Sequence, residues 1–499
     1  MMKTAEAARV MLNVYPDSIG ENLGDLLKWL ENPTIKDVFQ NIYILPSLFH
    51  SDLDRGFSVI DYDLNESLAS ESDLKKLSAM GISLKLDFVL NHMSVQSKQF
   101  NDILTNGDKS QYNDFFIDWN KFWLGCGTMT ESGYIQPDSE YLDKMHFRKS
   151  GLPLLMVKMC NGQRKPYWNT FYQEVVEKNG VTQYRGQMDL NVKSSLVWEF
   201  YDETLRKLSY YGAYIVRLDA FAYTAKEPGA RNFLNDPDTW TTLEQVRKLA
   251  DKYNLQLLPE IHAEYREKVH ERLAEEGYMI YDFFLPGLII HALEKKECKY
   301  LLRWILDILE NGMKTVNMLG CHDGIPLLDL RGLLPDDEIN DIIDVVVDRG
   351  GYVKDLQGNK KMYYQVNATY YSALGESDDK LLLSRAIQMF MPGIPQVWYL
   401  DLVGGTNDYE AVRSAGEGGH KEINRTNLSL LRAMHALNED VVSKQIDLLR
   451  LRNDSPAFGD GAKLTVKGDG AAFIMQWENG EHIARLDADL KTCEFSITT

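Results

Sequence analysis

Short apolar segments alternate along this chain with longer amphipathic ones. Helical patterns fill most of the gaps between the apolar segments, as at 71–80, 196–212 and 240–253. Eight apolar segments are long enough to form buried strands, and they lie at 9–15, 39–46, 82–92, 213–223, 255–262, 279–286, 315–324 and 392–400. Eight strand-then-helix units in this order predict an α/β protein, a (β/α)8 TIM barrel.

The alternation is interrupted twice by stretches that are too long for one crossover. The first is aromatic and rich in turn residues, for example at 111–134, and the second contains a helical pattern at 336–351. The tail carries four short β-type runs. We therefore predict a barrel of 1–94, 190–324 and 376–445, an inserted subdomain of 95–189 after strand three, another of 325–375 after strand seven, and a small C-terminal β domain of 446–499.

Composition narrows the class of protein. The 499 residues are 44% hydrophobic and 25% charged, which is typical of a globular protein. The net charge of −19, from 73 acidic and 54 basic residues, repels nucleic acid and anionic lipid, so neither is an expected partner. Five scattered cysteines, no evident signal sequence and no apolar run near ~20 residues predict a cytoplasmic protein with reduced thiols.

Charged or polar residues lie close to the ends of four of the eight predicted strands. Arg217 and Asp219 lie within the apolar segment 213–223, where burial of charge is costly unless the charge is paired or functional. Other polar residues follow the ends of further predicted strands, namely His92, Glu260, His322 and Asp323. Active sites of such barrels gather at the carboxyl ends of the strands, so we expect these side chains to face one mouth.

Converging carboxylates suit glycosyl transfer. A retaining mechanism uses one carboxylate as nucleophile and a second as acid and base. Arg217 precedes Asp219 by two residues and therefore lies on the same strand face, where it can keep Asp219 ionised. Two alternatives are a buried Arg–Asp pair that serves only the core and a catalytic metal held by histidines and carboxylates. Because no HxH or HExxH spacing occurs, we expect no metal and no cofactor.

Four ordered segments resemble the conserved blocks of glycoside hydrolase family 13, the α-amylase-like enzymes. They are VLNHMS (89–94), VRLDAFAY (216–223), LLPEIH (257–262) and GCHDG (320–324). The resemblance implies that Asp219 is the nucleophile, Glu260 the general acid/base and Asp323 the transition-state stabiliser. It also implies that Arg217, His92 and His322 line the glucose subsite.

Further segments resemble the sucrose phosphorylase subfamily, whose members act on sucrose, sucrose 6'-phosphate, glucosylglycerol or glucosylglycerate. They are DRGFSVIDY (54–62), YDFFLP (281–286), YQVNATYYSALG (364–375), PGIPQVWYL (392–400) and EINR (422–425). The resemblance covers nearly the whole chain. It implies retaining phosphorolysis of an α-glucoside through a β-glucosyl-enzyme, with phosphate as co-substrate and α-glucose 1-phosphate as product. The released acceptor would be fructose or fructose 6-phosphate.

The same resemblance assigns binding residues. Asp54 and Phe57 match positions that bind the donor glucose, and Phe171 matches an aromatic residue that shields the glucosyl intermediate. Further substrate-binding candidates are His262, Tyr364, Gln365 and Lys421. Arg148 and Lys149 are candidates for phosphate or the acceptor, with a solvated surface pair as the alternative.

Departures from the subfamily pattern lie around the acceptor. Lys421 stands where relatives usually carry an arginine, and 426–428 reads TNL instead of HYY. A tyrosine at 364 favours sucrose, whereas Lys360 and Lys361 favour a phosphorylated or acidic acceptor, so the acceptor stays open. An α-glucosidase or transglucosylase and a non-catalytic relative are the alternatives, although all three residues of the triad are present. We expect a monomer or a homodimer.

Overall fold

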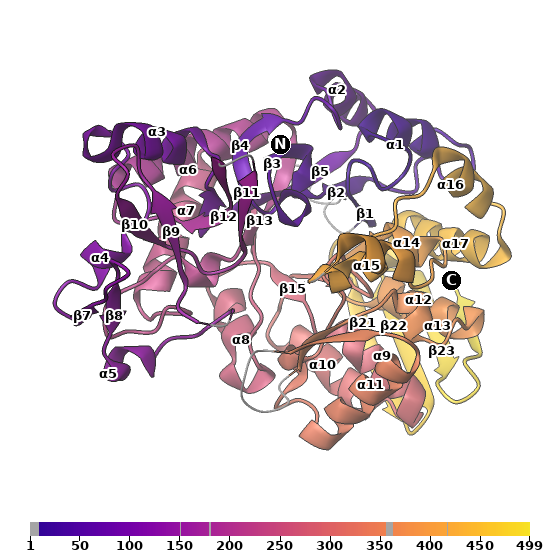
Figure 1. Ribbon diagram of the computed structural model, residues 1–499. Helices are drawn as coiled ribbons and strands as arrows, with labels where there is room; N and C mark the ends of the chain where they lie inside the picture. The colour runs from indigo at the N-terminus through magenta and orange to yellow at the C-terminus, as the bar shows by residue number, and fades with distance from the viewer. Residues whose placement is uncertain (1–8, 150, 179–180, 356–362, 417) are drawn as a thin grey trace. The chain divides into compact units, whose positions relative to one another are not determined.

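The barrel strands occur where the apolar segments predict them. The computed structural model describes residues 9–149, 151–178, 181–355, 363–416 and 418–499. Each of the eight apolar segments contains one strand, and these are β1 (Met11–Val14), β2 (Asn41–Ile44), β5 (Ser83–Val89), β13 (Ala213–Asp219), β14 (Gln256–Pro259), β15 (Ile280–Asp282), β16 (Thr315–Met318) and β20 (Ile394–Trp398). They form one eight-stranded sheet in the order β14-β13-β5-β2-β1-β20-β16-β15, which confirms the barrel-type α/β fold (Figure 1).

Continuous burial explains why these segments read as apolar runs. Parallel strands covered on both faces need mostly apolar side chains, and all residues of β1, β2, β16 and β20 are buried. Helices occupy the intervals between these strands and follow the last of them. They include α1 (Leu23–Leu30), α2 (Glu71–Ala79), α6 (Ser195–Tyr210), α7 (Asp238–Asp251), α8 (Val269–Glu275), α9 (Leu285–Lys295), α10 (Lys299–Glu310), α13 (Asp378–Phe390) and α17 (Asp440–Asp454).

The long interval between β5 and β13 has its own small core. It contains α3 (Lys98–Asn106), a hairpin of β9 (Leu154–Lys158) and β10 (Arg164–Trp168), and the sheet β11-β12-β6. In that sheet β6 (His92–Ser94) pairs with the end of β12 (Val181–Asp189), which pairs in turn with β11 (Gln173–Lys178). The core is aromatic and consists of Trp119, Trp123 and Trp168 with Ile117 and Ile135.

The interval after β16 and the tail are also structured. The first contains α11 (Asp336–Asp348) and a sheet of β17 (Ile325–Pro326), β19 (Tyr363–Asn367) and β18 (Tyr352–Asp355). The tail forms an antiparallel sheet of β21 (Lys463–Asp469), β22 (Ala472–Asn479), β23 (His482–Asp489) and β24 (Phe495–Thr498). Because α17 runs through 445 and 446, the predicted boundary between barrel and β domain falls inside a helix.

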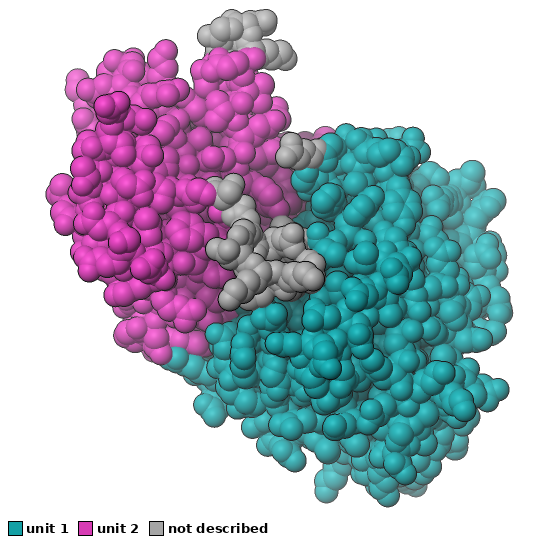
Figure 2. All heavy atoms as spheres, turned by 60° about the horizontal axis from the view of Figure 1, so that its bottom comes forward, with its two compact units in different colours: residues 1–43, 75–83, 262–499 teal, residues 44–74, 84–261 magenta. Residues whose placement is uncertain are grey.

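By contacts the chain forms two compact units, which Figure 2 colours separately. Unit 1 contains Met1–Tyr43, Lys75–Ser83 and His262–Thr499, and unit 2 contains Ile44–Leu74 and Leu84–Ile261. Each unit holds barrel strands together with an insertion, so this division differs from the predicted domains, which stay a prediction. None of the helices in the described part of the chain is long and apolar enough to cross a membrane.

Candidate active site

Three carboxyl groups surround one buried guanidinium in unit 2. The parallel register of β13 and β5 places Arg217 opposite Asp87. Arg217 Nη1 lies 2.6 Å from Asp87 Oδ1 and 3.1 Å from Asp219 Oδ1, and Nη2 lies 2.6 Å from Glu260 Oε1. The Arg217 side chain is 1% exposed and that of Asp87 is not exposed at all. We call these four residues the Arg217 cluster.

The charges of the Arg217 cluster do not balance. With every carboxyl ionised, three negative charges face one positive charge, and like charges this close disfavour full ionisation. A pair that served only the core would need one carboxylate, not three. The arrangement therefore suits a site in which one carboxyl donates a proton while another stays ionised.

Backbone hydrogen bonds hold Glu260 in place beside Asp219, and solvent can reach both carboxyls. The Glu260 N–H donates to the Leu218 carbonyl (3.2 Å), and the Ala220 N–H donates to Glu260 Oε2 (3.3 Å). The side chains of Asp219 and Glu260 are 13% and 14% exposed. A small ligand can therefore contact both carboxyls, whereas Asp87 is fully buried and contacts Arg217.

An aromatic wall lies beside the Arg217 cluster. His92 Nε2 lies 3.0 Å from the Phe57 carbonyl oxygen, and burial lowers the pKa of His92 to about 4. The Phe171 ring centroid is 5.2 Å from that of His92 and 5.1 Å from that of Tyr223. The Arg217 guanidinium lies 5.6 Å from the Phe57 ring centroid. A neutral imidazole and three rings suit the apolar faces of a sugar.

The segment before Phe57 is held in an uncommon backbone conformation. Asp54 and Arg55 have φ values of 52° and 45°, in the left-handed region that side chains other than glycine rarely adopt. Such strain often occurs at ligand-binding positions, since the surrounding structure must hold it in place. The turn brings Asp54 close to His92, whose pKa its charge raises against the larger effect of burial.

Arg148 lies beside the same wall, and Lys149 follows it in sequence. The Arg148 guanidinium lies 5.7 Å from the Phe171 ring centroid and 6.0 Å from that of Tyr223. The Lys149 ammonium donates to Asn169 Oδ1, and burial lowers the pKa of Lys149 to about 8. Both cations are thus partly enclosed near the aromatic wall, unlike a pair held in bulk solvent.

A second group of charges surrounds Asp323 in unit 1. Asp323 Oδ1 lies 2.5 Å from Lys421 Nζ and 3.9 Å from Arg425 Nη2, and Oδ2 lies 3.0 Å from His322 Nε2. Burial opposes ionisation, but the charges of His322, Lys421 and Arg425 hold the pKa of Asp323 well below its usual range. We call these four residues the Asp323 cluster, and its carboxylate is ionised at neutral pH.

The turn that carries Asp323 is held at several points. Gln365 Nε2 and Asn367 Nδ2 donate to the Asp323 carbonyl at 2.6 and 2.8 Å. The Gly320 N–H donates to Asp401 Oδ2 (2.9 Å), and a Cβ at Gly320 would lie only 2.6 Å from the same oxygen. A glycine is therefore required for this close approach.

Of the remaining predicted residues, the side chain of His262 is described and that of Tyr364 is not. His262 Nδ1 lies 3.0 Å from Asp329 Oδ2, and its ring stacks on Phe283 with centroids 3.9 Å apart. The side chain of Tyr364, together with Lys360 and Lys361, lies outside the described residues.

Comparison with known proteins decides the family. No protein-family model matches the chain. A sucrose 6(F)-phosphate phosphorylase from Ilumatobacter coccineus is 53% identical over 506 residues, which cover 100% of this chain and 97% of the relative. A sucrose phosphorylase from Streptococcus mutans serotype c is 33% identical, over 98% of this chain and 97% of the relative. The chain belongs to the sucrose phosphorylase family.

A solved structure within this family agrees with that result. The crystal structure of sucrose 6F-phosphate phosphorylase from Thermoanaerobacter thermosaccharolyticum superimposes with a TM-score of 0.89 and 34% identity, over 99% of this chain and 96% of that one. The predicted resemblance to α-amylase-like hexosyl-transferring phosphorylases is therefore confirmed.

Sequence reasoning missed Asp87, although its signal was present. Asp87 interrupts the apolar segment 82–92 in the same way that Arg217 interrupts its own segment, and the two side chains pair. Asp189 and Lys226 were also missed. They form a buried ion pair that no spacing or motif indicates.

Two other features, a group of three side chains with metal-ligating atoms and a pocket, are weaker candidates for the active site than the Arg217 and Asp323 clusters. Cys321, His322 and Asp323 offer ligand atoms within 4.8 Å of one another, but the Lys421 ammonium beside Asp323 would repel a cation. The expectation of no metal and no cofactor stays a prediction.

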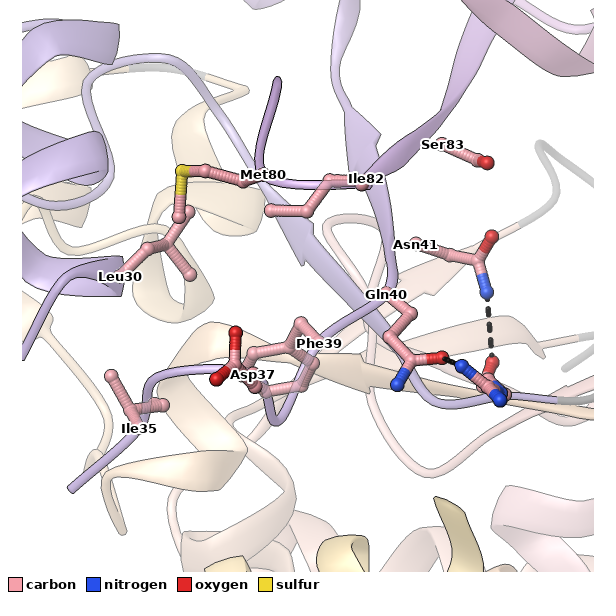
Figure 3. A pocket seen from close by; sticks show the side chains of 11 residues that line it. Leu30, Ile35, Asp37, Phe39, Gln40, Asn41, Met80, Ile82 and Ser83 are labelled. Atoms are coloured by element: carbon pink, nitrogen blue, oxygen red, sulfur yellow. Dashed lines mark hydrogen bonds between the residues drawn. The ribbon is translucent and has the colours of Figure 1, made fainter. Parts of the chain in front are cut away.

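A pocket of about 330 Å³, lined by Arg9, Asp37 and Gln40 among others, lies at the amino ends of β2 and β5 (Figure 3). Barrel enzymes use the opposite strand ends for catalysis.

Replacing Lys421 by methionine is expected to shift the pH dependence of activity. Lys421 is the cation nearest to Asp323, so its loss raises the pKa of Asp323. A carboxylate with a lowered pKa stays ionised until the pH falls through that pKa. The acid limb of kcat/KM should therefore move to higher pH. Lys421→Arg keeps the charge and should keep the wild-type limb. An unchanged limb in Lys421→Met would show that Lys421 does not control Asp323.

Proposed function

We propose that the protein is a retaining phosphorylase of sucrose 6'-phosphate, yielding α-glucose 1-phosphate and fructose 6-phosphate. The observation that carries this proposal is the 53% identity, across the whole chain, to a sucrose 6(F)-phosphate phosphorylase. The reduced state of all five cysteines supports a cytoplasmic location. The expected partners are the sugar substrate and phosphate.

The proposed first step transfers the glucosyl group to the protein. An oxygen of Asp219 forms a bond to the anomeric carbon while the bond from that carbon to the fructosyl oxygen breaks. Glu260 gives its proton to the departing oxygen. Arg217 contacts both carboxyls and orients them through two nitrogens of one planar group. The product of this step is a β-glucosyl ester of Asp219.

In the proposed second step, phosphate replaces the departed sugar. Glu260 takes a proton from phosphate, whose oxygen attacks the anomeric carbon, and Asp219 leaves as a carboxylate. Two inversions retain the α configuration. Asp323, held ionised by its three cationic neighbours, accepts hydrogen bonds from sugar hydroxyls, and these bonds strengthen as positive charge develops on the ring.

Arg148 and Lys149 support a phosphorylated acceptor. A partly enclosed arginine beside an aromatic ring can bind a phosphate group with two charge-assisted hydrogen bonds. Lys149 has a pKa of about 8 because burial disfavours its charge, so a nearby phosphate would favour its protonated form.

A substrate panel tests the proposal. The protein is incubated with sucrose 6'-phosphate, sucrose, glucosylglycerol or glucosylglycerate, each with and without phosphate, and glucose 1-phosphate is assayed. A charge-assisted hydrogen bond contributes about 1.5–3 kcal/mol, so kcat/KM for sucrose 6'-phosphate should exceed that for sucrose by about 10- to 100-fold. Preference for another acceptor would overturn the assignment of substrate. Phosphate-independent release of glucose would indicate an α-glucosidase or transglucosylase.

Two matched variants locate the acceptor phosphate. Arg148→Gln should narrow the ratio of kcat/KM between sucrose 6'-phosphate and sucrose, because it removes a charge beside Phe171. Lys144→Gln removes a charge from the same segment, but the Lys144 ammonium donates to the Gly229 carbonyl (2.8 Å) and should leave the ratio unchanged.

A further inference from the structure

A wholly buried ion pair joins three segments of unit 2 that carry candidate site residues. Lys226 Nζ lies 2.8 Å from Asp189 Oδ2, and the two side chains are 1% and 0% exposed. Neither residue contributes to the proposed chemistry. Burying two charges costs several kcal/mol per ion unless further hydrogen bonds satisfy them, so the partners of this pair are informative.

Every polar hydrogen of the Lys226 ammonium has an acceptor. It donates to Asp189, to Asn91 Oδ1 (2.8 Å) and to the Tyr223 carbonyl. Asp189 is equally saturated. It accepts from Asn91 Nδ2 (3.0 Å), from the Thr170 N–H (2.8 Å) and from the Thr170 hydroxyl (2.5 Å). A network this complete holds its members in one arrangement.

Each partner is a site residue or its neighbour in sequence. Asn91 precedes His92, Thr170 precedes Phe171, and Tyr223 packs against Phe171. The pair therefore ties together the start of β6, the turn that bears Phe171, and the 3-10 turn Phe221–Tyr223 that follows Asp219. These are the elements of the aromatic wall.

The network also determines which nitrogen of His92 carries the proton. Lys226 holds the Asn91 carbonyl oxygen, so the Asn91 amide nitrogen points to Asp189 and lies 3.4 Å from His92 Nδ1. An amide nitrogen can only donate, so Nδ1 must accept and the proton resides on Nε2. From there it is donated to the Phe57 carbonyl (3.0 Å).

We propose that Lys226, acting with Asp189, is a positioning residue that fixes the tautomer of His92 and the placement of Phe171 around the glucosyl group. The inference rests on the proposed site but not on which acceptor is used. It predicts that losing this pair slows both half-reactions equally, because the glucosyl group occupies the same wall in each.

The test replaces both charges together. Lys226→Met with Asp189→Asn removes the ion pair while it keeps an acceptor for Thr170, and removing both partners avoids an unpaired buried charge. The Asn91 amide should then turn over to accept from the new asparagine. This would place its oxygen beside His92 Nδ1, so that a neutral imidazole could no longer donate to both this oxygen and the Phe57 carbonyl.

We expect kcat/KM to fall while the protein stays folded. With α-glucosyl fluoride as donor, kcat/KM for the donor and kcat/KM for phosphate should each fall about 100-fold, because small misplacements of a binding wall have effects of this size. The thermal midpoint should stay within a few degrees of wild type. Lys193→Met removes the exposed ion pair to Glu227, the neighbour of Lys226, and should change the rate less than about twofold.

Two outcomes would overturn the proposal. One is a folded double variant with wild-type kcat/KM. The other comes from the wild type alone, in which ¹⁵N spectra of labelled histidine, assigned with His92→Gln, must show a neutral Nε2–H tautomer at pH 6. An imidazolium or an Nδ1–H tautomer would refute the proposal that Lys226 and Asp189 fix the tautomer of His92, even if the double variant fails to fold. Turnover of α-glucosyl fluoride without turnover of sucrose 6'-phosphate would refute the acceptor assignment only.

Discussion

Asp219→Asn is expected to lower phosphorolysis by about four orders of magnitude. An amide oxygen at the same position still contacts Arg217, but it is too weak a nucleophile to form the glucosyl ester. Losses of a nucleophile or its partner in other covalent mechanisms are of this order. Glucose 1-phosphate formation gives the rate. In acid-quenched wild-type protein incubated with α-glucosyl fluoride, the mass should rise by one glucosyl residue, and Asp219→Asn should show no such rise.

Asp87→Asn is the matched control for the nucleophile. Asp87 lies even closer to Arg217 (2.6 Å) than Asp219 does, but it is fully buried and cannot contact the sugar. Its loss should reduce the rate by about 10- to 100-fold, through a less firmly oriented guanidinium. Equal losses of rate in the two variants would argue that the pair of Arg217 and Asp219 serves the fold alone. A glucosyl adduct on Asp219→Asn would refute the role of Asp219 as nucleophile.

Glu260→Gln is expected to separate substrates by their leaving groups. Fructose 6-phosphate leaves as an alcohol and needs a proton, so its release should slow by about 10³-fold, within the range of general acid catalysis. Fluoride leaves without protonation, so formation of the glucosyl ester from α-glucosyl fluoride should slow less than about tenfold. Pre-steady-state measurement of fluoride release isolates this step.

Glu264→Gln provides a control with similar surroundings. Glu264 has the same side-chain exposure as Glu260, 14%, and also pairs with arginines, Arg266 and Arg331. It should retain wild-type kinetics on both donors. Uniform losses on both donors in Glu260→Gln would identify Glu260 as an orienting group and not as the acid.

Local sequence accounts for most of the fold. Parallel strands that are buried on both faces are mostly apolar, so β1, β13 and β20 were visible as runs. Local sequence also explains where α13 begins. Ser377 accepts a hydrogen bond from the Lys380 N–H, and acidic residues fill the first turn of α13. By contrast, the predicted limit at 445–446 falls inside α17, and the amphipathic pattern of this helix is weak.

The candidate site was predictable where a charge interrupts an apolar run. This reasoning identified Arg217, Asp219 and Glu260. Burial of a charge is costly, so a charge in an apolar run indicates pairing or function even when only one sequence is known. It reached Asp323 through its place after a predicted strand and through the resemblance to a family. The same reasoning, applied to 82–92, would have identified Asp87.

What only the tertiary structure decided is which distant side chains meet. Arg217 and Asp87 are 130 residues apart in sequence, Lys421 and Asp323 are 98 apart, and Lys226 and Asn91 are 135 apart. Periodicity tells which face of a strand a residue occupies, but the register between strands and the folding of loops set its partner. The sequence by itself thus determined the barrel and the candidate residues for glucosyl transfer. The three-carboxyl arrangement around Arg217, the cations that ionise Asp323 and the buried Lys226–Asp189 pair exist only because the folded chain brings these residues together in space.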